Sequence, residues 1–155
     1  MVIDKIKTRG LVSFVLTDEN GNIKQQQETN LVVSTGLAFI AQSMLKTTTN
    51  SPIAMTHMAV GTGAVAAAAA NTALGAEVAS ARVALTSATN VTTTVTNDAV
   101  QYVATFNPGV GTAALTEAGI FNAASAGTML CRTVFSVINK GALDTLTITW
   151  KVTVA

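Results

Sequence analysis

Charged residues are scarce in this 155-residue chain. Asp, Glu, Lys and Arg together make up 11% of it, against about 25% in an ordinary soluble domain. The net charge is +1 and no basic run is present, so the chain lacks the electrostatic footprint of a nucleic-acid-binding protein. Because interface cores are depleted of charge, such a surface favours contact with other proteins. The length fits a single domain, 1–155, with a sizeable core.

Long apolar runs and cysteine are lacking as well. The mean hydropathy is +0.46, yet no apolar stretch approaches the roughly 18 residues that a membrane-spanning helix needs. We therefore expect no membrane association. Residues 1–10 alternate charged and apolar side chains and have no signal-peptide core. Cys131 is the single cysteine, which excludes an intrachain disulfide and fits a reducing cytoplasm.

Residues that could carry chemistry are equally few. His57 is the only histidine, and a Ser-His-Asp or Cys-His arrangement would have to use it. It lies in a predicted strand with no nucleophile motif nearby. The stretch 123–127 (Ala-Ala-Ser-Ala-Gly) lacks the first glycine of a nucleophile elbow. One histidine and one cysteine cannot form a zinc site. We predict no catalytic residue, no metal site and no cofactor, and hence no enzyme.

Three weaker site patterns have simpler explanations. Met55 and His57 share a strand face and could offer soft ligands to copper, but a histidine packed beside core methionines accounts for them. Residues 18–22 alternate Asp, Asn and Asn as a calcium loop does, but the terminal glutamate is missing; a hairpin turn explains them. The Gly-Thr-Gly at 61–63 lacks the further residues of phosphate-binding loops, so its glycines indicate a tight turn or close backbone contact.

Threonine (25) and alanine (26) are abundant, and the second half of the chain alternates apolar and hydroxyl side chains. This pattern predicts a mainly β fold, an antiparallel β-sandwich of jelly-roll-like type. In the last predicted strand one face is apolar and the other carries Thr and Lys. That apolar face comprises Leu146, Ile148, Trp150, Val152 and Val154. The strands are expected near 55–60, 82–88, 91–96, 99–106, 115–121, 128–137 and 145–154.

The first third of the chain predicts a hairpin and one helix. A strand at 11–16, the Asn-Gly turn signal at 20–21 and a return strand at 23–27 form the hairpin. We expect residues 1–30 to be an arm beside a sandwich body at 53–155, so that deleting the arm leaves the body folded. A short helix is expected at 35–46 from a stripe with helical spacing, namely Leu37, Ile40, Ala41, Met44 and Leu45. The alanines at 66–70 fit a loop at least as well as a helix.

Two residues of opposite charge, Glu117 and Arg132, are predicted to pair. A four-residue hairpin loop at 123–126 would place them opposite each other on neighbouring strands. In so uncharged a region, the pair is better explained as fixing strand register or an oligomer contact than as catalytic. The opposite face of this hairpin would carry Cys131 as a buried small hydrophobe, together with Ala118, Ile120 and Met129. Glu77 and Arg82 offer a similar pair.

Several motifs resemble a family of small structural proteins from tailed bacteriophages and prophages. Two of them lie in the middle of the chain: His-Met-Ala-Val-Gly-Thr-Gly at 57–63 and Asn-Thr-Ala-Leu-Gly-Ala-Glu at 71–77. Three lie near the end: Leu-Thr-Glu-Ala-Gly-Ile-Phe-Asn at 115–122, Thr-Met-Leu-Cys-Arg-Thr-Val-Phe at 128–135 and Leu-Thr-Ile-Thr-Trp at 146–150. The N-terminal hairpin and residues 30–37 extend the resemblance over nearly the whole chain. The family places an arginine very soon after the equivalent of Glu77. Here four residues lie between Glu77 and Arg82, which argues against an ion pair between these two residues.

The resemblance implies a virion component that binds without catalysing a reaction. One placement is a capsid decoration or cement protein on the outer capsid surface, made in the host bacterial cytoplasm. Its partners would be the major capsid protein and copies of itself, as a homo-oligomer. The alternative is a tail-fibre, spike or adaptor component of the phage tail that takes part in host attachment. A 155-residue chain with no repeat or fibrous stalk is short for a fibre, which favours the capsid.

Overall fold

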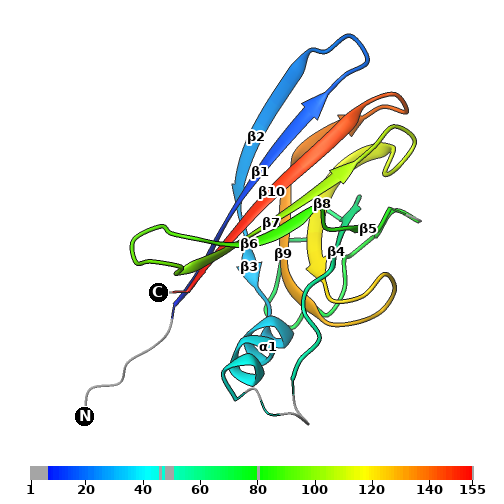
Figure 1. Ribbon diagram of the computed structural model, residues 1–155. Helices are drawn as coiled ribbons and strands as arrows, with labels where there is room; N and C mark the ends of the chain where they lie inside the picture. The colour runs from blue at the N-terminus through cyan, green and yellow to red at the C-terminus, as the bar shows by residue number, and fades with distance from the viewer. Residues whose placement is uncertain (1–6, 46, 48–50, 80, 155) are drawn as a thin grey trace.

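The computed structural model describes residues 7–45, 47, 51–79 and 81–154, and it is mainly β. Ten strands and one helix lie within these residues. The strands form two five-stranded antiparallel sheets (Figure 1), and the inner faces of the two sheets share one hydrophobic core. The predicted β-sandwich is confirmed, while the more specific likeness to a jelly roll stays a prediction.

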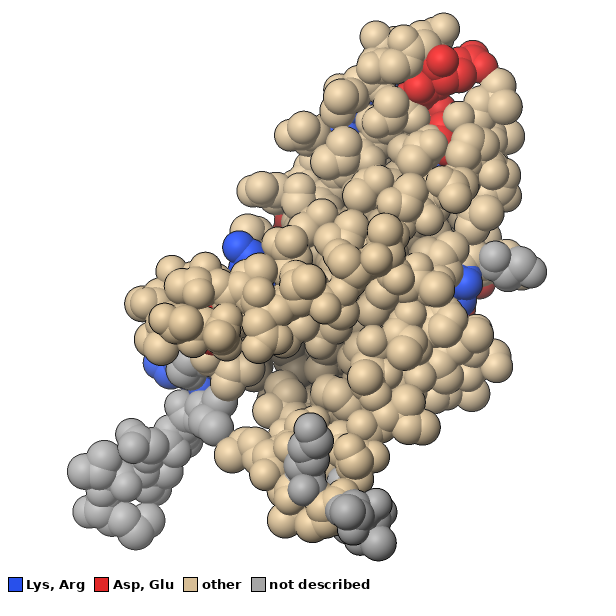
Figure 2. Space-filling model, in the orientation of Figure 1, with Lys and Arg blue, Asp and Glu red and all other residues tan. Residues whose placement is uncertain are grey.

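The first sheet, sheet A, has the strand order β2-β1-β10-β7-β6. Strands β1 and β10 pair over ten residues each, from Thr8 opposite Val154 to Thr17 opposite Thr145. The period-two pattern predicted for β10 is confirmed, because its apolar residues from Leu146 to Val152 are buried and its threonines are half-buried on the other face. In the view of Figure 2, few charged side chains lie on this side of the molecule. The bounds are β1 (Thr8–Thr17), β2 (Ile23–Thr29), β6 (Ser87–Val91), β7 (Ala99–Phe106) and β10 (Thr145–Val154).

The second sheet, sheet B, has the order β3-β9-β8-β4-β5. Its outer face carries a second small apolar cluster, formed by Val33, Ala59, Leu74, Phe121 and Met129. Leu74 comes from the segment 62–76, which crosses and covers part of this face. The bounds are β3 (Leu31–Val32), β4 (His57–Gly61), β5 (Val83–Ala84), β8 (Ala113–Phe121) and β9 (Met129–Lys140).

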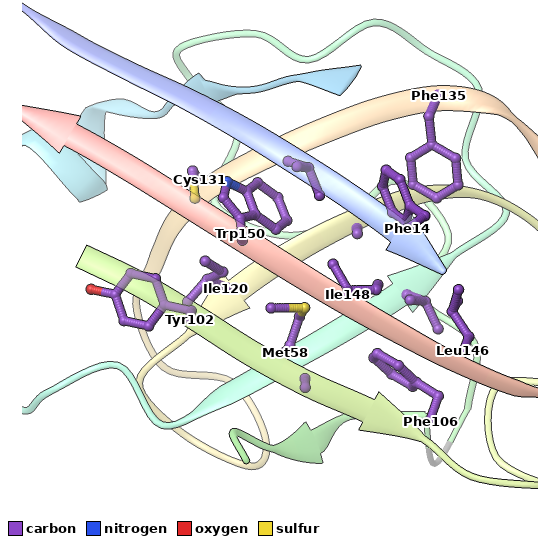
Figure 3. Packing of buried hydrophobic residues seen from close by; sticks show 14 of the residues in the cluster. Phe14, Met58, Tyr102, Phe106, Ile120, Cys131, Phe135, Leu146, Ile148 and Trp150 are labelled. Carbon is purple, nitrogen blue, oxygen red and sulfur yellow. The ribbon is translucent and has the colours of Figure 1, made fainter. Parts of the chain in front are cut away.

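The core lies between the sheets and is built from large side chains of both (Figure 3). Phe14, Phe106 and Trp150 come from sheet A, and Met58 and Ile120 come from sheet B; all five are buried. The rings of Phe14 and Phe135 span the two sheets with centroids 4.3 Å apart. Burial of each such side chain contributes about 1.5–3 kcal/mol, so this layer holds the two sheets together.

Strand β1 is a central part of sheet A and not part of a separate arm. It pairs with β2 on one side and with β10 on the other, and its Val12, Phe14 and Leu16 belong to the core. The predicted turn is present, because the Asp18 carboxylate accepts hydrogen bonds from the backbone amides of Asn20 and Asn22. This placement contradicts a separate arm, and we therefore expect that removing residues 1–30 would unfold the sandwich.

The predicted helix is present as α1 (Ser34–Leu45); Lys46 lies outside the described residues. Helix α1 approaches β9 so closely that a Cβ at Gly36 would overlap the carbonyl oxygen of Leu130. Phe39 and Ile40 pack against the core from half-buried positions. The predicted stripe is only partly buried, because Leu37, Met44 and Leu45 are 49%, 71% and 63% exposed.

Of three expectations for residues 66–96, one is wrong, one is partly correct and one is confirmed. The strand expected at 91–96 is wrong: β6 ends at Val91, and the following loop is organised by the Asp98 carboxylate. That carboxylate accepts hydrogen bonds from the amides of Thr93, Thr94 and Val95. The strand expected at 82–88 is divided into β5 and β6. The alanine run at 66–70 is a loop.

Candidate functional site

Glu117 on β8 and Arg132 on β9 meet on the outer face of sheet B, beneath the segment 62–76. The Nη2 atom of Arg132 lies 2.7 Å from Oε2 of Glu117, and Nε lies 2.9 Å from the same oxygen. Their side chains are 0% and 3% exposed, respectively. The two residues singled out from the sequence therefore form a fully buried, doubly hydrogen-bonded ion pair.

The strand register at this pair differs from the predicted one. Glu117 lies opposite Val134, and Arg132 lies opposite Gly119. The hairpin loop is longer than predicted, and Leu130 is an extra residue between the pairs Phe121–Met129 and Ile120–Cys131. Glu117 and Arg132 are thus diagonal neighbours, whose long side chains still reach each other. Because Leu130 shifts the alternation of faces, Met129 joins the outer cluster and not the core face predicted for it.

The Glu117 carboxylate also accepts hydrogen bonds from three backbone amides of the segment 62–76. Oε1 accepts from Gly63 at 3.0 Å and from Ala76 at 2.6 Å, and Oε2 accepts from Gly75 at 2.9 Å. A Cβ at Gly63 would overlap Oε1, and a Cβ at Gly61 would lie 2.6 Å from it. The expectation of close backbone contact at 61–63 is confirmed, and the contact is with a carboxylate.

Arg132 uses its remaining donors on the same segment. Its Nη1 donates to the side-chain oxygen of Asn71 at 2.9 Å, and its Nη2 donates to the carbonyl of Val65 at 3.0 Å. Asn71 in turn accepts a hydrogen bond from the amide of Ala68. The pair therefore fastens both ends of the segment 62–76 to the sheet, which a neutral hydrogen bond would do less strongly.

The chemistry of this arrangement is that of a structural clamp. The carboxylate accepts five hydrogen bonds, two from Arg132 and three from backbone amides, so its lone pairs are used within the protein. Burial raises the pKa of the Glu117 carboxyl, but hydrogen bonds from Ala76, Gly75 and Arg132 outweigh this, and the pKa lies below its ordinary value of 4.5. A general acid would need a raised pKa instead.

The lowered pKa of Glu117 predicts a specific loss of stability in acid. Between pH 4.5 and the lower pKa of the folded state, the unfolded chain binds more protons, so stability rises with pH in that window. The contribution of Glu117 is complete above pH 4.5 and disappears as the pH falls through the folded-state pKa. Urea unfolding from pH 7 to pH 3 should show a steeper acid loss for the native chain than for Glu117→Gln.

The other carboxyl groups with a lowered pKa are present in both the native chain and the variant, which makes the comparison specific to Glu117. Hydrogen bonds from Asn22 lower the pKa of Asp18, and the hydroxyl of Thr93 together with neighbouring amides lowers the pKa of Asp98. Both contribute equally to the two proteins, so the difference between the curves belongs to Glu117. Parallel curves would contradict the lowered pKa.

A second ion pair joins Glu77 and Arg82, although the departure from the family pattern argued against it. Arg82 Nε and Nη2 donate to the two Glu77 oxygens at 3.0 and 2.7 Å. The arginine also donates to the carbonyls of Ala123 and Ala126 and lies 3.8 Å above the ring of Phe121. The five-residue spacing suffices because β5 returns Arg82 to the β8–β9 loop, which the pair holds in place.

The remaining candidates from the sequence do not converge on a site. His57 starts β4 and contacts the hydroxyl of its neighbour Thr56 at 2.8 Å. Cys131 is a buried apolar residue, as predicted, and burial raises the pKa of its thiol. Among the described residues, no three His, Cys, Asp or Glu side chains lie close enough together to hold a metal ion.

Lys140 is a buried charged residue that the sequence did not single out. Its Nζ donates to the carbonyls of Asn107 and Asp144, at 3.1 and 2.7 Å. It therefore joins the β7–β8 turn to the β9–β10 turn at one end of the sandwich. Desolvation lowers its pKa. A lysine followed by glycine has the pattern of an ordinary exposed turn, so no sequence signal marked it as buried.

Comparison of the chain with protein-family models, with curated proteins and with solved structures finds no match. In the described residues, no helix has the length and apolar character that crossing a membrane requires.

Proposed function

We propose that this chain is a non-enzymatic virion structural protein that decorates the outer capsid surface and binds the major capsid protein. The observation that carries the proposal is the scarcity of free charge on its surface. A protein whose surface is largely buried in contacts with neighbouring proteins does not need many charged surface residues, because the centres of protein interfaces are depleted of charge. The phage-family resemblance of the motifs described above supports the same conclusion.

The surface is poorer in charge than the composition alone indicates. Between residues 47 and 139 only five residues are charged, and each of them is occupied within the chain. Glu117 and Arg132 are buried against each other. Glu77 and Arg82 form the second pair, with side chains 29% and 9% exposed. The Asp98 carboxylate is bound by its own loop. This long stretch therefore presents mainly Thr, Ala and Val side chains to its surroundings.

Helix α1 is the surface that we assign to the shell. Its 12 residues carry no charge, and its Leu37, Met44 and Leu45 are exposed. Exposed apolar side chains in such a group are typical of protein-binding sites. The N-terminal hairpin is part of sheet A, so we place the contact with the shell on the helix and not on the hairpin.

The placement on the capsid is tested by counting copies in purified virions by quantitative mass spectrometry. An icosahedral shell needs hundreds of copies of a decoration protein, whereas a tail component of low symmetry is present in roughly ten. Hundreds of copies are the expected result. A count near ten would replace the capsid placement by the alternative, a tail-fibre, spike or adaptor component.

The role of α1 is tested by binding purified chain to shells that lack it. The variant Met44→Glu/Leu45→Glu should lose most of its binding, because it places two charges in the proposed interface. Thr72→Glu, at an exposed loop position outside the helix, is the control and should bind as the native chain does. Undiminished binding by the double variant would exclude the helix as the contact surface.

A further inference from the structure

The outer face of sheet A is uncovered in the described part of the chain, whereas the segment 62–76 covers part of the outer face of sheet B. Its side chains are Thr, Ser, Gln, Val and single Leu and Ile residues, and Arg9 and Lys151 supply its only charges. Figure 2 looks onto this face, which is almost entirely uncharged. The hydroxyls of Thr105 and Thr147 lie 3.4 Å apart across two strands of this face. Outward-facing side chains on neighbouring strands form rows across the sheet. One row contains Ser13, Thr149, Val103 and Ser87. The next contains Gln25, Val15, Thr147 and Thr105.

We propose that this face binds the same face of a second copy, making a two-fold symmetric dimer in which the two A sheets pack together. Five strands spaced about 4.8 Å apart, the longest of ten residues, present on the order of 700 Å². A stable interface of standard size needs about 800 Å² from each partner. Two twisted sheets of this kind pack face to face with their strands nearly aligned. This inference does not depend on the virion proposal.

The charges around the face select the direction of the two-fold axis. Arg9 and Lys151 lie toward one end of the strands. The opposite end carries Asp18 and Glu19 in the β1–β2 turn and Asp144 just before β10, and the acidic turn is red in Figure 2. An axis running across the strands places the basic end of each copy over the acidic turns of the other. An axis along the strands would place like charges together, which is unfavourable.

Two nearby charges do not disturb this pattern. Asp98 lies at the basic end, but its carboxylate is bound by the amides of its own loop. Lys24 lies toward the acidic end, but it is opposite Leu16 and so belongs to the other face of the sheet. With the axis across the strands, β1 of one copy lies over β1 of the other, and the two β10 strands likewise lie over each other. Thr149 then faces its own copy at the centre, and Arg9 faces the turn that carries Glu19.

Sedimentation velocity of the full chain over a range of concentrations tests the dimer. We expect a species of twice the 15.8 kDa chain mass. Thr149→Glu places two carboxylates together at the centre and should weaken the dimer by at least about a hundredfold. Thr72→Glu, the same substitution at an exposed loop position outside sheet A, should leave the dimer unchanged. Circular dichroism checks that each variant is folded, and Ser13→Glu replaces Thr149→Glu if the latter does not fold.

A charge exchange tests the axis. Arg9→Glu and Glu19→Arg should each weaken the dimer by about two- to fivefold, as expected of exposed pairs, and the double variant should restore it. A monomer at all concentrations, a trimer, or a dimer that survives both Thr149→Glu and Ser13→Glu would overturn the proposed interface. Failure of the double variant to restore the dimer would overturn the axis. Neither outcome affects the copy-number test of the virion placement.

Discussion

Breaking the Glu117–Arg132 pair should cost about 3–5 kcal/mol of unfolding free energy, the usual penalty for leaving one partner of a buried pair alone. Glu117→Gln leaves the Arg132 guanidinium buried without its counter-charge and brings an amide NH2 group toward donors from Gly63, Gly75 and Ala76. Arg132→Met leaves the carboxylate with amide donors only and removes the donors to Val65 and Asn71. Urea unfolding at pH 7 measures both losses.

The Glu77–Arg82 pair provides the matched control, since it joins the same residue types in a more exposed place. Glu77→Gln should cost about 1–2 kcal/mol, because Gln can still accept a hydrogen bond and Arg82 keeps its bonds to the carbonyls of Ala123 and Ala126 and its contact with the Phe121 ring. A double-mutant cycle between Glu117→Gln and Arg132→Met should give a coupling of about 1–3 kcal/mol. Additive losses would show that the two side chains act independently, contrary to the clamp described above.

Replacing Phe14 in β1 by alanine should cost about 3–5 kcal/mol, as for other buried aromatic residues. The ring is buried in the core and packs on Phe135 of the opposite sheet, so its removal leaves a cavity between the sheets. Ser13→Ala, at the next position but on the outer face, should change the unfolding free energy by about 0.5 kcal/mol or less at concentrations where the chain is monomeric. Urea unfolding distinguishes the two.

Deleting residues 1–30 should abolish the fold for the same reason. The deletion removes β1 from between β2 and β10 and takes Val12, Phe14 and Leu16 out of the core. We expect a chain without a cooperative unfolding transition, seen by circular dichroism and by rapid proteolysis. A folded product would show that β10 and β7 can form sheet A without β1.

The alternation of apolar and polar residues predicted most of the strands, but it did not predict which strands pair with each other. The alternation in β10 and the Asn-Gly turn after β1 each involve residues close in sequence, and both are present in the structure. Pairing of β1 with β10 joins opposite ends of the described chain, and nothing in either strand alone specifies that partner. The alternation of β1 shows that one face is buried, but it does not distinguish an arm that packs onto the body from a strand inside a sheet.

The ion pair could be predicted because charge is so rare in this region, while its register could not. An unpaired charge on an apolar strand needs a partner, and Arg132 was the nearest candidate along the hairpin. The irregularities at 115–117 and at Leu130 shift the strands, and no residue type there signals a bulge. The amides that bind Glu117 come from a loop 41 to 54 residues away, where only the glycines at 61 and 63 indicated close packing.

The pairing of β1 with β10 also sets the order in which the molecule can form. Residues 8–17 have no strand partner other than β2 until residues 145–154 have been synthesised, whereas the β8–β9 hairpin can close as soon as its own strands exist. Pairing of distant segments is slow because a long loop must close first. During synthesis β1 and β2 therefore wait as an isolated hairpin with one apolar face open to solvent, and that interval is when the chain is most prone to aggregate.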